Sequence, residues 1–285
     1  MKLYVVDSFT TQRFMGNQAG VALLDAETEF PHPEIMRAMA AELKHSETAF
    51  VRQSGDTSYT IRYFTPAGEV DLCGHATIAL FTVLRQVNGI AAGNYTAETP
   101  AGRLKIRLED DMVWMDMVDP VKLHEFEPDE SQALYAAYGL TPAAGRSDLA
   151  PQIISIGLRD ILLPVSDKEI LDQAVMDAAQ VSALSRQYDV VGVHMFCLGD
   201  GEEAVYCRNF APLYDISEEA ATGTSNGALA YYLSDHGLIK DDHMYTFVQG
   251  EAMGKRSYVY TSISRNKVKI GGRAVITLVC SLFGE

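Results

Sequence analysis

Short runs of β-branched and aromatic residues, closed by Gly, Asp, Asn or Pro, dominate the hydrophobic pattern of this chain. Such runs are typical of strands, because these side chains pack well on a half-buried pleated surface. The strands predicted in this way are LYVVDSF, ETAFVRQ, SYTIRYF, RLKIRLE, MVWMDMV, HMFCLGD, AVYCRNF, YTFVQG, SYVYTSISR, KVKIGG and AVITLVC. The pattern therefore predicts a protein that is rich in β-sheet.

Apolar positions repeat at helical spacing in only a few segments. The predicted helices cover residues 33–43, 78–86 with a start near Gly74, 130–138 and 226–236, and a weaker one covers 168–188. HATIALFTVL and SNGALAYYL are apolar almost all round, which predicts that these two helices are buried inside their sheets. The polar stretch 121–149 directly follows Pro120 and contains Pro128 and Pro142, and it predicts a domain boundary.

One part of the first half of the chain recurs in the second half. Residues 49–66, AFVRQSGDTSYTIRYFTP, match residues 195–212, MFCLGDGEEAVYCRNFAP, at one constant offset. After three extra residues the match resumes with CGHATIALF over TGTSNGALA. The aligned pairs include Phe50 with Phe196, Arg62 with Arg208 and Gly74 with Gly223. An internal repeat of this length predicts two copies of one α+β unit.

The repeat and the boundary signals together predict two domains. The first covers residues 1–122, with the C-terminal strand 275–285 returning to it, and the second covers residues 123–274. Two equivalent domains create a cleft between them, which is a common place for a small-molecule site. Each copy directs a glycine-containing turn and a helix start into that cleft.

The two helix starts have the chemistry of an anion site. A buried helix with an open N-terminus offers unpaired N–H groups and a partial positive charge. Gly74 and Gly223 allow close approach of the backbone, and His75 and Thr224 follow them as side-chain donors. We therefore expect a small carboxylate as the ligand. The alternative, that both are ordinary tight turns between a strand and a helix, stays open.

Composition and net charge limit the partners and the cellular location that we expect for this protein. The 285 residues are 47% hydrophobic, which is enough for two cores, and 23 Lys and Arg stand against 38 Asp and Glu. A net charge of -15 without a Lys/Arg run argues against nucleic acid as a partner. No segment approaches the roughly 20 apolar residues of a membrane helix. The start of the chain lacks the apolar core of a signal peptide, so we expect a cytoplasmic protein without membrane contact.

The cysteines show no spacing that is typical of a disulfide framework or a zinc site. Cys73, Cys197, Cys207 and Cys280 include no CxxC pair, and no paired histidines lie near them in the sequence. We expect free thiols and no metal.

Three segments resemble the signature segments of a known family. LKHSETAFV, YTIRYFTPAGEVDLCGHATIA and RNFAPLYDISEEAATGTSNGA, in this order, resemble the phenazine-biosynthesis PhzF family, which has the diaminopimelate epimerase-like fold. The resemblance extends from VDSFTTQRFMGNQAGVALL to VKIGGRAV, nearly the whole chain. It implies an α+β fold of two pseudo-symmetric domains, each a β-sheet or barrel wrapped around a central α-helix. It also implies a homodimer without organic cofactor or metal, and an isomerase that moves a proton on a small carboxylate-bearing substrate in the interdomain cleft.

The resemblance implies roles for individual residues. Glu47, in Ser46-Glu47-Thr48, matches the catalytic glutamate of the family and is the expected proton shuttle, with His75 and Glu219 as further catalytic residues. The residues that it implies for substrate binding are Ser46, Asn17, Cys73, Gly74, Gly223, Thr224 and Ser225.

The second copy departs from the family pattern. PhzF proteins typically show Glu-Asp-Pro-Ala-Thr-Gly-Ser, whereas this chain has Glu219, Ala220 and Thr224 in place of the Asp, the Pro and the Ser. Glu keeps the carboxylate one methylene further out, and Thr keeps the hydroxyl but narrows the pocket. We expect acid/base capacity to survive and the choice of substrate to differ.

Two other functions stay open at this point. Racemases and epimerases of this fold use two cysteines as opposed acid and base. Cys73 matches the first, Ala220 stands where the second is expected, and Glu219 or Glu47 would have to act opposite Cys73. The third possibility is a small-molecule binding dimer that has lost its activity.

Overall fold

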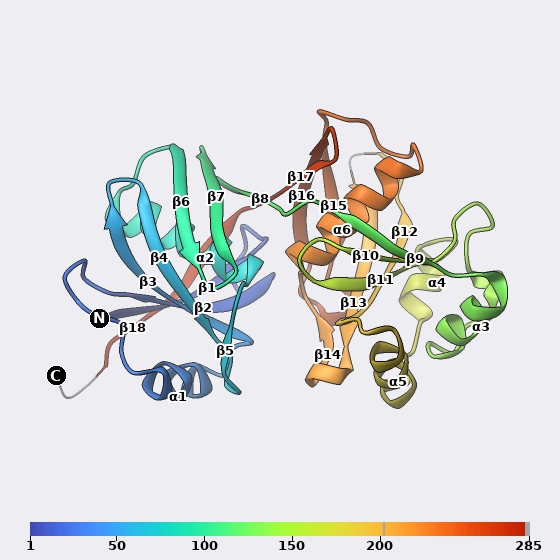
Figure 1. The fold of residues 1–285 in the computed structure, drawn as a ribbon, viewed down its shortest axis with the longest axis horizontal. Coiled ribbons are helices and arrows are strands. Elements are labelled where there is room, and N and C mark those ends of the chain that lie inside the picture. The colour runs from blue at the N-terminus through green and yellow to red at the C-terminus, as the bar shows by residue number, and fades with distance from the viewer. Residues whose placement is uncertain (202, 283–285) are drawn as a thin grey trace. The chain divides into compact units, whose positions relative to one another are not determined.

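The computed structural model describes residues 1–201 and 203–282, and these form two compact units. Unit 1 comprises Met1–Asp116 and the chain from Gly271 onward, and unit 2 comprises Met117–Ile270. The chain therefore passes from one unit to the other near residue 116 and again near residue 270 (Figure 1). The boundaries expected from the sequence, after residues 122 and 274, lie a few residues beyond these points.

Unit 1 is a mixed β-sheet with two helices. Its strands are β1 (Lys2–Ser8), β2 (Asn17–Leu23), β3 (Glu47–Gly55), β4 (Ser58–Phe64), β5 (Glu69–Val70), β6 (Gly93–Thr99), β7 (Gly102–Glu109), β8 (Met112–Asp116) and β18 (Ala274–Cys280). They pair in the order β18, β1, β2, β3, β4, β6, β7, β8, and β5 pairs with β4. The pairs β2 with β3 and β4 with β6 are parallel, and the other pairs are antiparallel.

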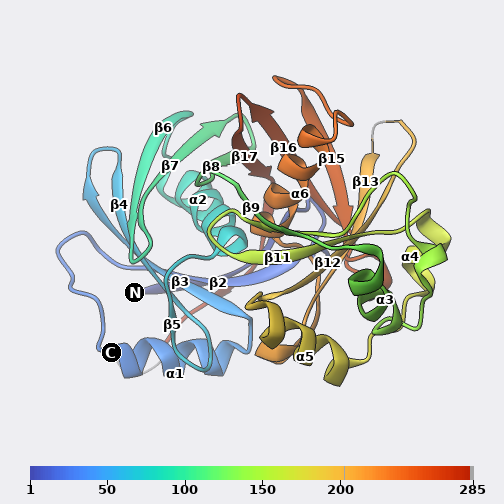
Figure 2. The same cartoon turned by 45° about the vertical axis from the view of Figure 1, so that its right-hand side comes forward.

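Helices cover both faces of the unit 1 sheet. Helix α2 (Gly74–Asn88) packs against β1, β2, β3, β8 and β18 (Figure 2). Helix α1 (Pro33–Leu43) lies on the other face, where its buried Met36 and Ala40 contact Phe50 and Phe64. Residues of α2 from Gly74 to Leu84 are all buried, as its apolar sequence predicts. Side chains alternate between faces along a strand, so successive residues of β3 are directed in turn toward α1 and toward α2.

Unit 2 has its own mixed sheet. Its strands are β9 (Val121–Glu125), β10 (Gln152–Ser155), β11 (Arg159–Pro164), β12 (Gly192–Leu198), β13 (Glu203–Ala211), β14 (Ile216–Glu219), β15 (Met244–Gln249), β16 (Ser257–Ser264) and β17 (Lys267–Gly272), whose last residues belong to unit 1. Pairing runs β9, β10, β11, β12, β13, β15, β16, with β14 on β13. Only β11 with β12 and β13 with β15 are parallel among these pairs.

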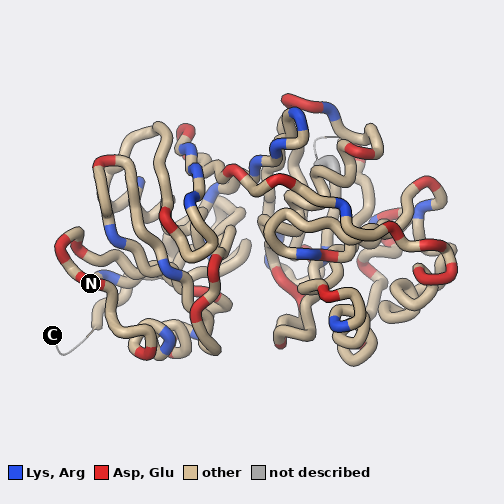
Figure 3. Tube along the Cα trace, viewed as in Figure 1, with Lys and Arg blue, Asp and Glu red and all other residues tan. Residues whose placement is uncertain are grey.

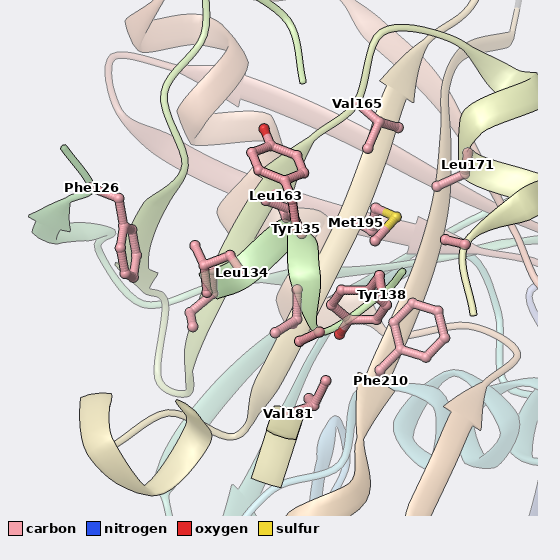
Figure 4. Packing of buried hydrophobic residues seen from close by; sticks show 14 of the residues in the cluster. Phe126, Leu134, Tyr135, Tyr138, Leu163, Val165, Leu171, Val181, Met195 and Phe210 are labelled. Atoms are coloured by element: carbon pink, nitrogen blue, oxygen red, sulfur yellow. The ribbon is translucent and has the colours of Figure 1, made fainter. Parts of the chain in front are cut away.

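Helix α6 (Gly223–Asp235) packs on one face of this sheet, against β10, β11 and β16. The other face is covered by α3 (Pro128–Ala136), α4 (Lys168–Gln173) and α5 (Ala178–Tyr188). Figure 4 shows the core between these helices and the sheet, where Tyr138 packs on Phe210 with ring centroids 5.0 Å apart and Val181 lies nearby. Burial of these large side chains stabilises the unit, at roughly 1.5–3 kcal/mol for each.

The strand register corrects one detail of the predicted repeat. Antiparallel and parallel pairs follow in the same order in both units, but Phe50 lies opposite Arg62, whereas Met195 lies opposite Arg208. The match of Phe50 with Phe196 is therefore wrong by one residue. A constant offset assumes hairpins of equal length, and the register of β3 against β4 contains an irregularity near the hairpin.

Most predicted helices occur in the structure. The helix at 33–43 is α1, and α2, α3 and α6 cover most of the other three predicted ranges. The weak prediction over 168–188 is wrong as one helix, because α4 and α5 are separate, each with an aspartate N-cap, Asp167 and Asp177. The predicted boundary stretch 121–149 contains β9 and α3.

Charged residues are distributed over both units. Lys and Arg lie scattered among Asp and Glu along the trace (Figure 3). Within the described residues, each helix is either too short or too polar to cross a membrane.

Candidate active site

The turn that precedes α2 is held by hydroxyl groups. Cys73 is the N-cap residue in extended conformation, and its carbonyl accepts from both the N–H and the hydroxyl of Thr77, the latter at 2.7 Å. The hydroxyls of Tyr63 and Thr77 lie 2.6 Å apart. These bonds connect the first turn of α2 to strand β4, so the side chains at the helix start are fixed relative to the sheet.

Strand alternation places Glu47 beside this turn. Phe50 packs on α1. Thr48, two residues earlier, lies on that same face, so Glu47 faces α2. Glu47 is also the first residue of β3 and lies opposite Ala19 of β2. A carboxylate at a strand end next to a helix start is therefore a consequence of the register of unit 1.

His75 is the centre of a group of polar side chains. Its Nε2 lies 3.2 Å from Oε2 of Glu47 and 3.3 Å from Oγ of Ser46. Its Nδ1 lies 3.4 Å from Sγ of Cys73 and 3.4 Å from Nδ2 of Asn17. The side chain of His75 is 5% exposed and that of Glu47 is 17% exposed. Unit 1 thus brings together five of the residues predicted for the site, from β2, β3 and α2.

Two residues that the sequence analysis did not name support this group. The hydroxyl of Ser8 donates to the carbonyl of His75 at 2.8 Å, which holds the first turn of α2 against β1. Gly16 has a φ of +69°, and a Cβ there would lie 2.2 Å from the carbonyl oxygen of Ser8. Only glycine fits this position, which directly precedes Asn17. The one sequence feature that could have identified Gly16 was its position directly before Asn17 in the segment GNQAG.

In unit 2, Glu219 lies at the end of β14, before the start of α6. Its Oε2 accepts from the hydroxyl of Thr222 at 2.9 Å. Gln249 is the residue that holds this turn: its Nε2 donates to the carbonyl of Glu219 at 2.7 Å, and its Oε1 accepts from Thr222 N and from Asn226 Nδ2. Sequence reasoning missed Gln249, because a lone Gln in a strand carries no motif.

The start of α6 is buried, and one of its predicted binding groups is already engaged. Gly223, Thr224 and Ser225 are all buried. The hydroxyl of Ser225 donates to the carboxyl of Asp160 at 2.7 Å and accepts from Asn209 Nδ2 at 3.1 Å. In this structure the Ser225 hydroxyl is therefore occupied by hydrogen bonds within unit 2.

The network around Ser225 contains two buried titratable groups. Asn209 Nδ2 also lies 3.1 Å from Nδ1 of His194. Burial raises the pKa of the Asp160 carboxyl to about 7, and the nearby Glu219 adds to this effect, whereas the bond from Ser225 opposes it. Burial lowers the pKa of the His194 imidazole to about 3. Desolvation disfavours the charged form of each group, so between the two pKa values, at mildly acidic pH, both groups are mainly neutral.

In each unit, one arginine stabilises the strand that precedes the buried helix start. Arg62 makes two bonds to Glu69, at 2.7 and 2.6 Å, and Arg208 makes two bonds to Glu218, at 2.9 and 2.8 Å. Each guanidinium also lies over a phenylalanine ring of its own strand. These arginines hold the strands that precede the two helix starts.

Comparison with known proteins decides the family. The family model described as "Phenazine biosynthesis-like protein", PhzC-PhzF, matches residues 6–279. The chain belongs to this family. It is 30% identical to the uncharacterized isomerase YddE of Escherichia coli K12, over 96% of both chains. It is accordingly an enzyme of the PhzF-like isomerase type.

Solved structures agree with the fold. A PhzF family protein of Bacillus anthracis is similar with a TM-score of 0.86 at 24% identity and 99% coverage of both chains. A probable proline racemase of Agrobacterium radiobacter is similar with a TM-score of 0.64 at 14% identity, over 99% of this chain and 92% of the other. The α+β fold of PhzF proteins and of proline racemases, predicted from the signature segments, is confirmed.

Proposed function

We propose that this chain is a cofactor-independent isomerase that moves a proton on a small carboxylate-bearing substrate, with Glu47 as general acid and base. The observation that carries the proposal is the enclosed contact of Glu47 with His75, Oε2 to Nε2 at 3.2 Å. A carboxyl group that takes a proton from one carbon and returns it to another needs partial shielding from water and a fixed orientation. Both conditions hold for Glu47.

His75 has two tasks in this proposal. Its ring lies against the carboxylate through Nε2, and its backbone carbonyl is held by the hydroxyl of Ser8. In the proposed mechanism the imidazole orients the Glu47 carboxylate through this approach, which tightens when substrate is bound, and it offers a donor to the substrate. Ser46 lies at the same nitrogen and limits the rotation of the ring. Glu219 is proposed as a further acid or base, oriented by Thr222.

The substrate carboxylate is proposed to bind at helix starts. The N–H groups of the first turn of a helix lack partners within the helix and carry a partial positive charge. The two starts, at Gly74 and Gly223, have extended N-cap residues without a side-chain cap bond. Arg62 and Arg208, on the strands before the two helix starts, are engaged by Glu69 and Glu218, which favours the backbone amides as the anion site. Thr224 is the proposed added donor.

A second candidate function has a specific observation in its favour. Sγ of Cys73 lies 3.4 Å from Nδ1 of His75, so an imidazole is at hand to accept the thiol proton. A racemase or epimerase would use Cys73 on one side of the substrate carbon and a carboxylate on the other. The third candidate, a binding protein without activity, does not explain why a carboxylate is enclosed beside the imidazole.

Exchange of solvent deuterium tests these functions. The protein is incubated in deuterated buffer with a panel of small amino, hydroxy and aromatic carboxylic acids, and each acid is analysed by mass spectrometry and NMR. Deuterium at a carbon that differs from the site of proton loss supports the isomerase. Exchange only at the α-carbon with loss of chirality supports the racemase, and thermal stabilisation without exchange supports the binding protein. The homodimer and the cytoplasmic location stay predictions.

A further inference from the structure

We propose that Glu47, Cys73 and His75 bind one Zn²⁺ ion, and that this ion inhibits the enzyme by occupying its proton shuttle. One ligand atom from each of the three residues lies within 4.8 Å of the other two. The inhibition rests on the proposed function of Glu47. The binding does not, because it depends only on the ligand set.

The chemistry of the three side chains matches zinc. Thiolate sulfur, imidazole nitrogen and carboxylate oxygen are the ligands that zinc takes in proteins, and three protein ligands leave a fourth position for water. A thiolate and a carboxylate together balance the two positive charges of the ion. On binding, the thiol of Cys73 releases its proton to solvent. A harder ion such as Mg²⁺ would not select a sulfur ligand.

Two of the three separations between the ligand atoms also match. Nε2 of His75 lies 3.2 Å from Oε2 of Glu47 and 3.9 Å from Sγ of Cys73. A tetrahedral zinc ion with ordinary bond lengths separates nitrogen from oxygen by about 3.4 Å and nitrogen from sulfur by about 3.6 Å. Both distances are therefore within a few tenths of an ångström of those that the ion requires.

The sulfur completes the site by a side-chain rotation. Sγ lies 3.4 Å from Nδ1 and 3.9 Å from Nε2 of the same ring, so it lies over the imidazole rather than at its edge. Sγ and the ligand oxygen of Glu47 lie within 4.8 Å of each other, and rotation of Cys73 about its Cα–Cβ bond is the movement that the proposal requires to bring the sulfur to the ion. Ser46 Oγ, 3.3 Å from Nε2, lies where it can bind the water in the fourth position.

The surrounding groups favour an ion at this point. Oε2 of Glu47 is buried and, within the described part of the chain, accepts no hydrogen bond of ordinary geometry in spite of the nearby imidazole. A buried carboxylate oxygen with a lone pair to spare is stabilised by a cation. Nδ2 of Asn17 lies 3.4 Å from Nδ1, the ring nitrogen that would not bind the ion, and an amide turned by 180° places its oxygen there to accept the Nδ1 proton. Such a partner is usual for a metal-binding histidine.

Zinc at this position blocks proton transfer. Coordination uses the lone pair of Glu47 that accepts the substrate proton, and it fixes His75 as well. The side chain of Glu47 is 17% exposed, so the ion has a path to the site.

Metal titration tests the binding without any substrate. Metal-free protein competes for Zn²⁺ with a chromophoric chelator, and Co²⁺ serves as a spectroscopic probe of sulfur ligation. We expect one tight Zn²⁺ per chain and a sulfur-to-cobalt charge-transfer band. Both should be kept in Cys280→Ala, the control at the partly exposed cysteine of β18. Cys73→Ala and Cys73→Ser should lose the band and weaken Zn²⁺ binding by at least about 100-fold, since loss of a group that only orients a ligand already costs 10–100-fold.

A Zn²⁺ affinity that is equal in wild type and in both Cys73 variants overturns the proposal, as does a cobalt spectrum without sulfur ligation in folded wild type. Circular dichroism of each metal-free variant verifies folding. Deuterium exchange with and without one equivalent of Zn²⁺ then tests inhibition. If the wild type binds zinc through Cys73 but catalyses no exchange in the absence of metal, the proposed function fails and the metal site stands.

Discussion

Oε2 of Glu47 lies 3.2 Å from Nε2 of His75, although the two residues are 28 positions apart in the chain. Glu47 begins β3, and His75 is the second residue of α2. The pair exists because α2 packs against β3 and its neighbours with its first turn held by Ser8 and Thr77. The acid/base group and its partner thus belong to one rigid part of unit 1.

The thiol beside this pair separates the isomerase from the racemase. If proton transfer runs through Glu47, Cys73→Ala keeps more than roughly a tenth of the activity, because the change removes one atom from a 7% exposed side chain. The expected loss of stability is about 1 kcal/mol. Deuterium exchange rates measure the activity, and chemical denaturation measures the stability. Complete loss of exchange in a stably folded variant would favour Cys73 as the catalytic base.

The arginine pairs predict unequal losses of stability in the two units. Arg208 and Glu218 are only 12% and 15% exposed, whereas Arg62 and Glu69 are 25% and 31% exposed. Removing Arg208 leaves a largely buried carboxylate without its partner, so we expect Arg208→Met to lower the free energy of unfolding by about 3 kcal/mol. Arg62→Met should cost about 1 kcal/mol. Urea denaturation of both variants gives the comparison.

A double variant isolates the effect of the unpaired carboxylate charge. In Arg208→Met with Glu218→Gln, no unpaired charge remains, so part of the lost stability should return. The bonds from Arg208 to the carbonyls of Leu171 and Ala174 stay broken, so the recovery is incomplete. Equal destabilisation by Arg208→Met and Arg62→Met would contradict the burial argument.

Asp160 and His194 predict opposite effects of pH on stability. The pKa of Asp160 is raised by burial from 3.8 to about 7, so between these values the native state holds a proton that the unfolded chain has released. Its contribution to stability therefore falls as pH rises. The pKa of His194 is lowered by burial from 6.5 to about 3, so there the unfolded chain holds the extra proton and the contribution rises with pH.

Single variants separate the two contributions. Relative to wild type, Asp160→Asn should gain stability as pH rises from 4 to 7, at up to roughly 1 kcal/mol per pH unit. As pH rises from 3 to 6.5, His194→Gln should lose stability relative to wild type. Urea denaturation at a series of pH values gives both differences. Parallel curves for wild type and Asp160→Asn would show that the two native states bind protons alike.

Much of this fold is readable from local sequence. Aromatic and β-branched runs such as SYTIRYF indicate their strands, and the apolar sequence after Gly74 indicates that α2 is buried. Strand β2 was not predicted, because NQAGVAL contains few β-branched residues and is defined by its neighbours β1 and β3. The separation of α4 from α5 depends on two aspartate caps inside one amphipathic pattern.

The acid/base role of Glu47 was predicted only through the family resemblance, whereas the helix starts at Gly74 and Gly223 were predicted from the repeat. Motifs pointed to Glu47 and His75, but the approach of Cys73 to Glu47 depends on the packing of α2 against β3. The expectation of no metal-binding set rested on spacing along the chain, and Glu47 lies 26 residues before Cys73. Ser8 bonds a backbone carbonyl and Gln249 bonds both backbone and side-chain groups of the turn before α6, and neither contact follows from the pattern of residue types.

The most direct measurement of the central claim is deuterium exchange catalysed by Glu47→Gln. The amide keeps the size of the side chain but cannot carry a proton, so we expect the rate to fall by about 10²–10⁴-fold with circular dichroism unchanged. Glu42→Gln, an exposed position of α1, is the matched control and should exchange like wild type. Exchange by Glu47→Gln at the rate of wild type and of Glu42→Gln would contradict the account.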